Sequence, residues 1–171
     1  MTVGEHIHAL VAECRDRLLA AEIPTEAVGA YESSRRRFLF TRAERIVPLT
    51  RAWRLGILLI DEEGQLRSAG ATLRAHQPPP ILGYASESAR HRDELRHAAI
   101  RGGFAEGETV HYDTYIIDCE VVRAETGPIS LRDGRPVVRW HLNTSLTSAI
   151  PLEQYLEDRL ELLIHPPLGA T

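Results

Sequence analysis

The chain has 171 residues and 43% hydrophobic content, so one folded domain could bury roughly 70% of the surface that the unfolded chain exposes. Its formal net charge is -4 and its sequence pI is about 6.1, which argues against general nucleic-acid binding because such proteins usually carry a basic excess. A site for an anion must therefore be local.

All 20 basic residues are arginine, since the sequence contains no lysine. A P-loop needs a lysine on the phosphates, and pyridoxal-phosphate enzymes, Schiff-base enzymes and Ser-Lys hydrolases need an amine that can lose its proton. Arginine does not lose its proton at ordinary pH, so these classes are excluded. We expect no cofactor and no metal.

The N-terminal segment predicts an amphipathic helix rather than a secretory signal. Thr2 and Glu5 form a capping-box pattern, and apolar residues then recur at helical spacing over residues 3–21. The longest apolar run, 55–60, is too short for a membrane span. Cys14 and Cys119 lack metal-ligand spacing and are interpreted as buried thiols in a reduced, cytoplasmic protein.

Several elements are predicted in the middle of the chain. Residues 25–33 are interpreted as a short second helix. Residues 53–60 are apolar on both faces of an extended chain and are interpreted as a central strand covered on both sides. Turn residues 61–64 then lead into a returning strand over 65–73, forming a hairpin. The prolines at 78–80 predict a rigid crossover before the next helix.

That helix is expected at 88–101, ending at a glycine pair, and a long strand at 109–123 follows it. Asp133-Gly134 predicts a tight turn, and Pro151 opens the last helix. The remaining C-terminal elements are a strand pair, 129–131 with 136–138, and a strand at 137–143.

This order predicts an α+β fold with an antiparallel or mixed sheet and with N-terminal, middle and C-terminal helices packed mainly on one face. We expect a single domain over residues 1–164 and a flexible tail over 165–171.

An arginine-rich segment follows the first helix. Residues 34–54 contain seven arginines and one acid, Glu44, a local excess of +6. Guanidinium groups bind phosphate or carboxylate in a bidentate manner, so the segment suits an anionic ligand, and it would equally suit an acidic patch on a second subunit. Solvated arginines that pair with Glu or Asp on the N- or C-terminal helix are the structural alternative. The candidate binding residues are Arg35, Arg36, Arg37, Arg42, Trp53 and Arg54.

A second group of polar residues lies in the C-terminal strands. Alternation places His111 and Asp113 on one strand face, together with Tyr115, and it places Arg139 and His141 on one face of another strand. A histidine with a carboxylate and a second histidine could form a general base. An antiparallel strand with one solvent-exposed face would display the same residues. No known catalytic sequence motif supports a catalytic site here.

The helix segment HRDELRH offers Glu94 and His97 at i, i+3 spacing, but His91 and His97 lie about 120° apart around the axis. A di-iron site needs a second such helix, which the sequence lacks. We therefore interpret this segment as a charged surface helix.

Two resemblances concern the middle of the chain. The order of RLGILLIDEEGQLRSAG and RHAAIRGG resembles the first half of the cytidine-deaminase fold, but the His-x-Glu and Pro-Cys-x-x-Cys zinc motifs are absent. Over residues 51–118, RAWRLGILL, ELRHAAIRGGF and EGETVHYD are similar to a family of small uncharacterised actinobacterial proteins, some labelled glutaminase. The Ser-Lys pair of serine glutaminases cannot exist here, and Cys119 stands beside two acids, which disfavour a thiolate.

The sequence therefore favours a non-catalytic cytoplasmic binding domain that uses the arginine-rich segment for a small anionic ligand or an acidic protein partner. Trp53 and the phenylalanines near the arginines have the composition of an interface core, so a homodimer is expected. The competing hypothesis is a small hydrolase or transferase that uses His111, Asp113 and His141.

Overall fold

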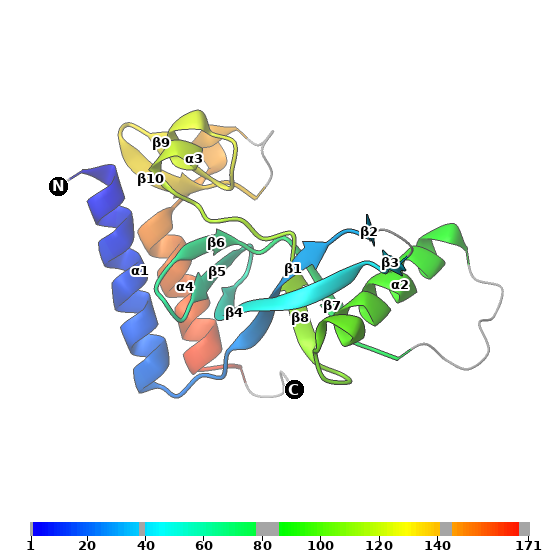
Figure 1. Ribbon diagram of the computed structural model, residues 1–171. Coiled ribbons are helices and arrows are strands. Elements are labelled where there is room, and N and C mark those ends of the chain that lie inside the picture. Colours follow the sequence, from blue (N-terminus) through cyan, green and yellow to red (C-terminus); the bar gives the residue numbers. More distant parts are fainter. Residues whose placement is uncertain (1, 38–39, 78–85, 141–144, 168–171) are drawn as a thin grey trace. The chain divides into compact units, whose positions relative to one another are not determined.

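The computed structural model describes residues 2–37, 40–77, 86–140 and 145–167 (Figure 1). The described part contains four α-helices, a mixed sheet and smaller antiparallel sheets, so the predicted α+β fold is confirmed. The helices are α1 (Val3–Ala20), α2 (Glu87–Gly102), α3 (Cys119–Ala124) and α4 (Leu152–Ile164). The strands are β1 (Glu26–Glu32), β2 (Arg35–Arg37), β3 (Phe40–Arg42), β4 (Arg45–Leu55), β5 (Leu58–Asp61), β6 (Leu66–Ser68), β7 (Ala71–Arg74), β8 (Thr109–Tyr112), β9 (Ile129–Arg132), β10 (Arg135–Val138) and β11 (Ile150–Pro151).

The chain divides into two compact units. Unit 1 comprises residues 1–25, 52–68 and 115–171, and unit 2 comprises residues 26–51 and 69–114. Strand β4 contributes to both units, because its first seven residues belong to unit 2 and its last four to unit 1. The single domain expected from the sequence stays a prediction. None of the described helices has the length and apolar composition that a membrane span requires.

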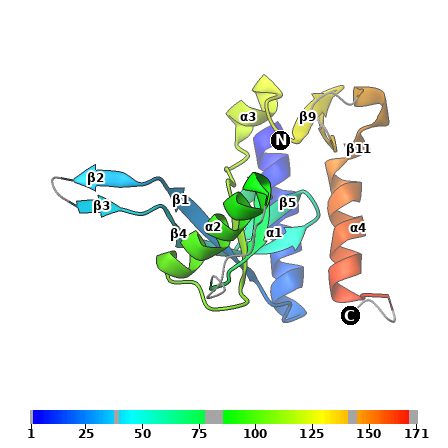
Figure 2. The same cartoon turned by 90° about the vertical axis from the view of Figure 1, so that its right-hand side faces the viewer.

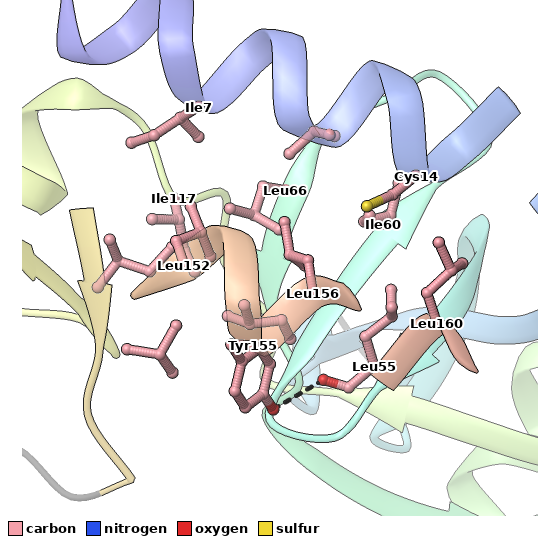
Figure 3. Packing of buried hydrophobic residues seen from close by; sticks show 14 of the residues in the cluster. Ile7, Cys14, Leu55, Ile60, Leu66, Ile117, Leu152, Tyr155, Leu156 and Leu160 are labelled. Carbon is pink, nitrogen blue, oxygen red and sulfur yellow. Dashed lines mark hydrogen bonds between the residues drawn. The ribbon is translucent and has the colours of Figure 1, made fainter. Parts of the chain in front are cut away.

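The core of unit 1 lies between helices α1 and α4 and the hairpin strands (Figures 1 and 3). Helix α1 begins at the predicted capping box, in which the Thr2 hydroxyl accepts the Glu5 N–H and the Glu5 carboxylate accepts the Thr2 N–H. Helix α4 begins after Pro151, as predicted, and buries the following side chains on one stripe: Leu152, Tyr155, Leu156 and Leu160.

The hairpin of unit 1 differs from the prediction at residues 53–60. This apolar run is not one strand: β4 ends at Leu55, the chain turns at Gly56 with φ +67°, and β5 begins at Leu58. Both halves are apolar because both are buried, and only glycine adopts this turn conformation without steric cost. The predicted turn at 61–64 is confirmed, since β5 pairs antiparallel with β6. The returning strand predicted over 65–73 is wrong, because β6 ends at Ser68 and β7 pairs with β8.

Unit 2 contains strands in the order β4, β1, β8 and β7, with β1 parallel to β8 and β7 antiparallel to β8. Its core is formed by one sheet face and helix α2, which ends at a left-handed Gly103 as predicted from the glycine pair. The buried residues are Ala27, Ile46, Ala75, Leu95, Ala98, Ala99, Phe104 and Val110.

The short helix predicted at 25–33 is wrong, because these residues form β1. Glutamate and alanine have good helix propensity, but β1 lies between two strands that satisfy its backbone groups. Its Gly29 also lies so close to β4 that a Cβ there would stand 2.4 Å from Ile46 Cγ2. Tertiary pairing therefore overrides local propensity.

The long strand predicted at 109–123 is also wrong. Strand β8 ends at Tyr112, and residues 119–124 form helix α3 after Asp118, whose carboxylate accepts two backbone N–H groups at the N-terminus. The predicted hairpin of β9 and β10 is confirmed. Residues 78–80, 141–144 and 168–171, which the predictions above include, lie outside the described residues.

The two cysteines differ in environment, contrary to the prediction that both are buried. Cys14 is buried on α1, and burial raises the pKa of its thiol to about 11. Cys119 is exposed, and it is the first residue of α3 rather than part of a strand.

We expect one thiol to react rapidly with Ellman's reagent in the native protein and the second only on unfolding, since the thiolate is the reactive form. The measurement is thiol titration at pH 8 with and without denaturant. Cys119→Ser should abolish the rapid phase, and Cys14→Ser should retain it. Two rapid thiols in the native protein would contradict the burial of Cys14.

Candidate functional site

The arginine-rich segment forms an antiparallel ribbon of β2 and β3 that continues β1 and β4 in unit 2 (Figure 2). Its register places Arg35 opposite Arg42, Arg36 opposite Thr41 and Arg37 opposite Phe40. Like charges that lie directly opposite on neighbouring strands destabilise a sheet. The ribbon therefore holds a repulsive pair, and both Arg35 and Arg42 are exposed to solvent.

The carboxylate of Glu32 lies at the base of this ribbon. Arg45 Nε donates to Glu32 Oε2 at 2.6 Å, and this hydrogen bond lowers the pKa of the Glu32 carboxyl, with further lowering from the charges of Arg45, Arg42 and Arg35. The Glu32 carboxylate therefore feels the charge of three guanidinium groups. Because Arg45 holds that carboxylate directly, the charges of Arg35 and Arg42 are only partly balanced.

The other acid near the ribbon, Glu44, is also engaged. The Tyr31 hydroxyl donates to its carboxylate, and this hydrogen bond raises the pKa of Tyr31. The backbone carbonyl of Glu44 accepts a hydrogen bond from Arg101 of α2 at 2.9 Å. These contacts anchor the start of β4 beside the ribbon.

Three further residues of the arginine-rich segment have other roles. Trp53 is only 3% exposed in the core of unit 1, where its indole N–H donates to the Ile23 carbonyl, so it cannot contribute to an exposed interface core. Arg54 is exposed and donates to the Gly56 carbonyl of the adjacent turn. Arg51 pairs with Glu108 at 3.4 Å, and this acid lies on neither the N-terminal nor the C-terminal helix, where the structural alternative placed the partners.

The second candidate site is centred on His111 of β8. Its side chain is fully buried and makes a hydrogen bond at each ring nitrogen: Nε2 lies 2.6 Å from Glu26 Oε2, and Nδ1 lies 2.9 Å from Thr72 Oγ1. These three residues come from β1, β8 and β7, and we call them the Glu26–His111–Thr72 chain.

The strand register explains this arrangement. Thr72 is the direct partner of His111 on β7, and Val28 is its partner on β1, so Glu26, two residues before Val28, points to the same face. Val110 and Leu73 point to the opposite face and pack into the core with α2. The Glu26–His111–Thr72 chain therefore lies on the sheet face that α2 does not cover.

The sequence identified His111 but not its partners. Asp113 follows the end of β8 and has φ +55°, so strand alternation does not extend to it, and His141 lies outside the described residues. Tyr115 and Arg139 belong to unit 1, where Arg139 donates to the Glu125 carbonyl. Glu26 was missed because β1 was predicted to be a helix, and no sequence signal linked Thr72 to His111.

Comparison of the chain with protein-family models, with curated proteins and with solved structures finds no match.

Proposed function

We propose that the protein is a binding module that uses the β2–β3 ribbon to hold an acidic, extended polypeptide segment. The observation that carries this proposal is the register that sets Arg35 opposite Arg42. A carboxylate between the two guanidinium groups would replace their repulsion with charge-assisted hydrogen bonds. Such a partner would stabilise the ribbon as it binds.

The shape of the ribbon favours a peptide over a small ion. Small ligands are usually held in concave pockets, and the ribbon is a two-stranded sheet. Each of its strands has an outer edge whose backbone groups can pair with an added strand. Backbone pairing would supply affinity, and the arginines would select acidic side chains.

The test is fluorescence anisotropy with a labelled decapeptide of glutamates. Arg35→Glu with Arg42→Glu should weaken binding by about tenfold or more, because attraction becomes repulsion, and binding to the wild type should weaken as salt rises. The matched control is Arg92→Glu with Arg123→Glu, two exposed helix residues. Both double variants change the net charge by -4, from -4 to -8.

Equal losses in the two double variants would show that only overall charge matters and would overturn the proposal. Displacement of the peptide by millimolar inorganic phosphate would likewise overturn the preference for a peptide and favour a small anion. A homodimer, with an acidic surface of a second copy on the ribbon, stays a prediction, and sedimentation of the ribbon variant would detect its loss.

A further inference from the structure

We propose that the Glu26–His111–Thr72 chain is an acyl-transfer site, in which Thr72 is the nucleophile toward carboxylic esters, His111 is the general base and Glu26 is a positioning residue. This site is separate from the ribbon. It is composed of a hydroxyl, an imidazole and a carboxylate in hydrogen-bond series, the arrangement that activates a weak hydroxyl nucleophile.

The direction of the two hydrogen bonds follows from the partners. An ionised Glu26 carboxylate can only accept, so Nε2 of His111 carries a hydrogen and donates it. In the neutral imidazole, Nδ1 then has a free lone pair and accepts the hydroxyl hydrogen of Thr72. The 2.9 Å separation lies within the distance over which a base can take that proton.

Burial and exposure are distributed as such a site requires. Thr72 is exposed, so a substrate can reach its oxygen, whereas the His111 side chain is shielded from water. When His111 takes the proton it becomes a buried cation, which would be costly without a partner. The Glu26 carboxylate at 2.6 Å supplies the compensating charge.

A positive side chain lies on the same face as the nucleophile. Arg74 follows Thr72 by two residues on β7 and is exposed, and the intervening Leu73 packs into the core on the other side. Its guanidinium can therefore approach the substrate from this face, where it would stabilise the oxyanion that forms on attack.

The reaction balances without a cofactor. As Thr72 Oγ bonds to the carbonyl carbon, its proton moves to His111 Nδ1, and it then passes to the departing alkoxide when the ester bond breaks. Water attacks the acyl-threonine, gives a proton to His111 and releases Thr72, which takes that proton back. The net change is one ester and one water to one acid and one alcohol.

The test uses p-nitrophenyl acetate and the whole protein, with intact mass and peptide mass spectrometry to find the acetyl group. We expect acetylation of the peptide that contains Thr72. Thr72→Ala should abolish it and Thr72→Ser should retain it, because serine keeps the hydroxyl. Thr109→Ala, on the adjacent strand, is the matched control and should be labelled as fast as the wild type.

Glu26→Gln tests positioning, because a neutral amide no longer stabilises the protonated His111. Labelling at Thr72 should slow by about tenfold or more and change its pH profile, with the melting temperature unchanged. Equal acetylation of Thr72→Ala and wild type, or an acetyl group that maps only to other residues, would overturn the proposal. Thermal unfolding of Thr72→Ala checks that this variant is folded, since the substitution removes a hydrogen bond to the buried His111.

Discussion

Replacing Tyr155 with phenylalanine should lower the free energy of unfolding by about 1–3 kcal/mol, although the ring is retained. The Tyr155 side chain is 1% exposed, and its hydroxyl is hydrogen-bonded to Leu55, where the β4–β5 turn begins (Figure 3). It donates to the Leu55 carbonyl at 2.9 Å and accepts the Ile57 N–H at 3.0 Å. Phenylalanine would leave both backbone groups without this partner, which is costly in a buried turn.

Urea unfolding followed by circular dichroism measures this loss. The matched control is Tyr115→Phe, which removes the same atom from a side chain that is 41% exposed and should change the stability by less than about 0.5 kcal/mol. If the two variants were equally stable, the hydroxyl of Tyr155 would not secure the turn.

Replacing Gly102 with alanine should destabilise the protein by about 3 kcal/mol or more. Gly102 is the last residue of α2, and a Cβ at this position would lie 1.5 Å from the carbonyl oxygen of Ile46 on β4. That oxygen belongs to the backbone, so the helix and the strand would have to separate. Helix propensity alone predicts the opposite sign, a gain of about 1 kcal/mol for alanine over glycine.

The adjacent Gly103 provides the control. Its φ is +109°, so alanine is strained there, but among the described residues no atom beyond its chain neighbours lies within 4 Å of the added Cβ. Gly103→Ala should therefore cost about 1–2 kcal/mol, less than Gly102→Ala. Thermal unfolding of the two variants measures the difference. A Gly102→Ala variant as stable as the wild type would show that α2 does not approach β4 this closely.

The predictions from sequence succeeded where the local chain carries the signal. The capping box at Thr2, the turn at Asp133-Gly134 and the stop of α2 at the glycine pair depend on side chains a few residues apart. The apolar stripe of α4 is likewise visible because burial on a helix repeats with the helical period. The α+β class follows from such elements together.

The failures concern segments whose structure depends on distant partners. Residues 26–32 have acceptable helix propensity, and only their place between β4 and β8 makes them a strand. Residues 53–60 are apolar throughout, so periodicity could not locate the turn at Gly56. Residues 109–123 were predicted to form one strand because polar and apolar residues alternate there. In the structure, β8 ends at Tyr112 and helix α3 begins after Asp118.

The sequence by itself determined that the positive charge is arginine alone, that it is concentrated in residues 34–54, and that no lysine chemistry is possible. Only the tertiary structure placed Arg35 opposite Arg42, buried Trp53, and brought Glu26 and Thr72 to the two nitrogens of His111. The physical reason is that composition and local pattern are properties of neighbouring residues. Strand register, in contrast, is set by which distant segments pair, and a shift of one residue would turn each of these side chains to the other face.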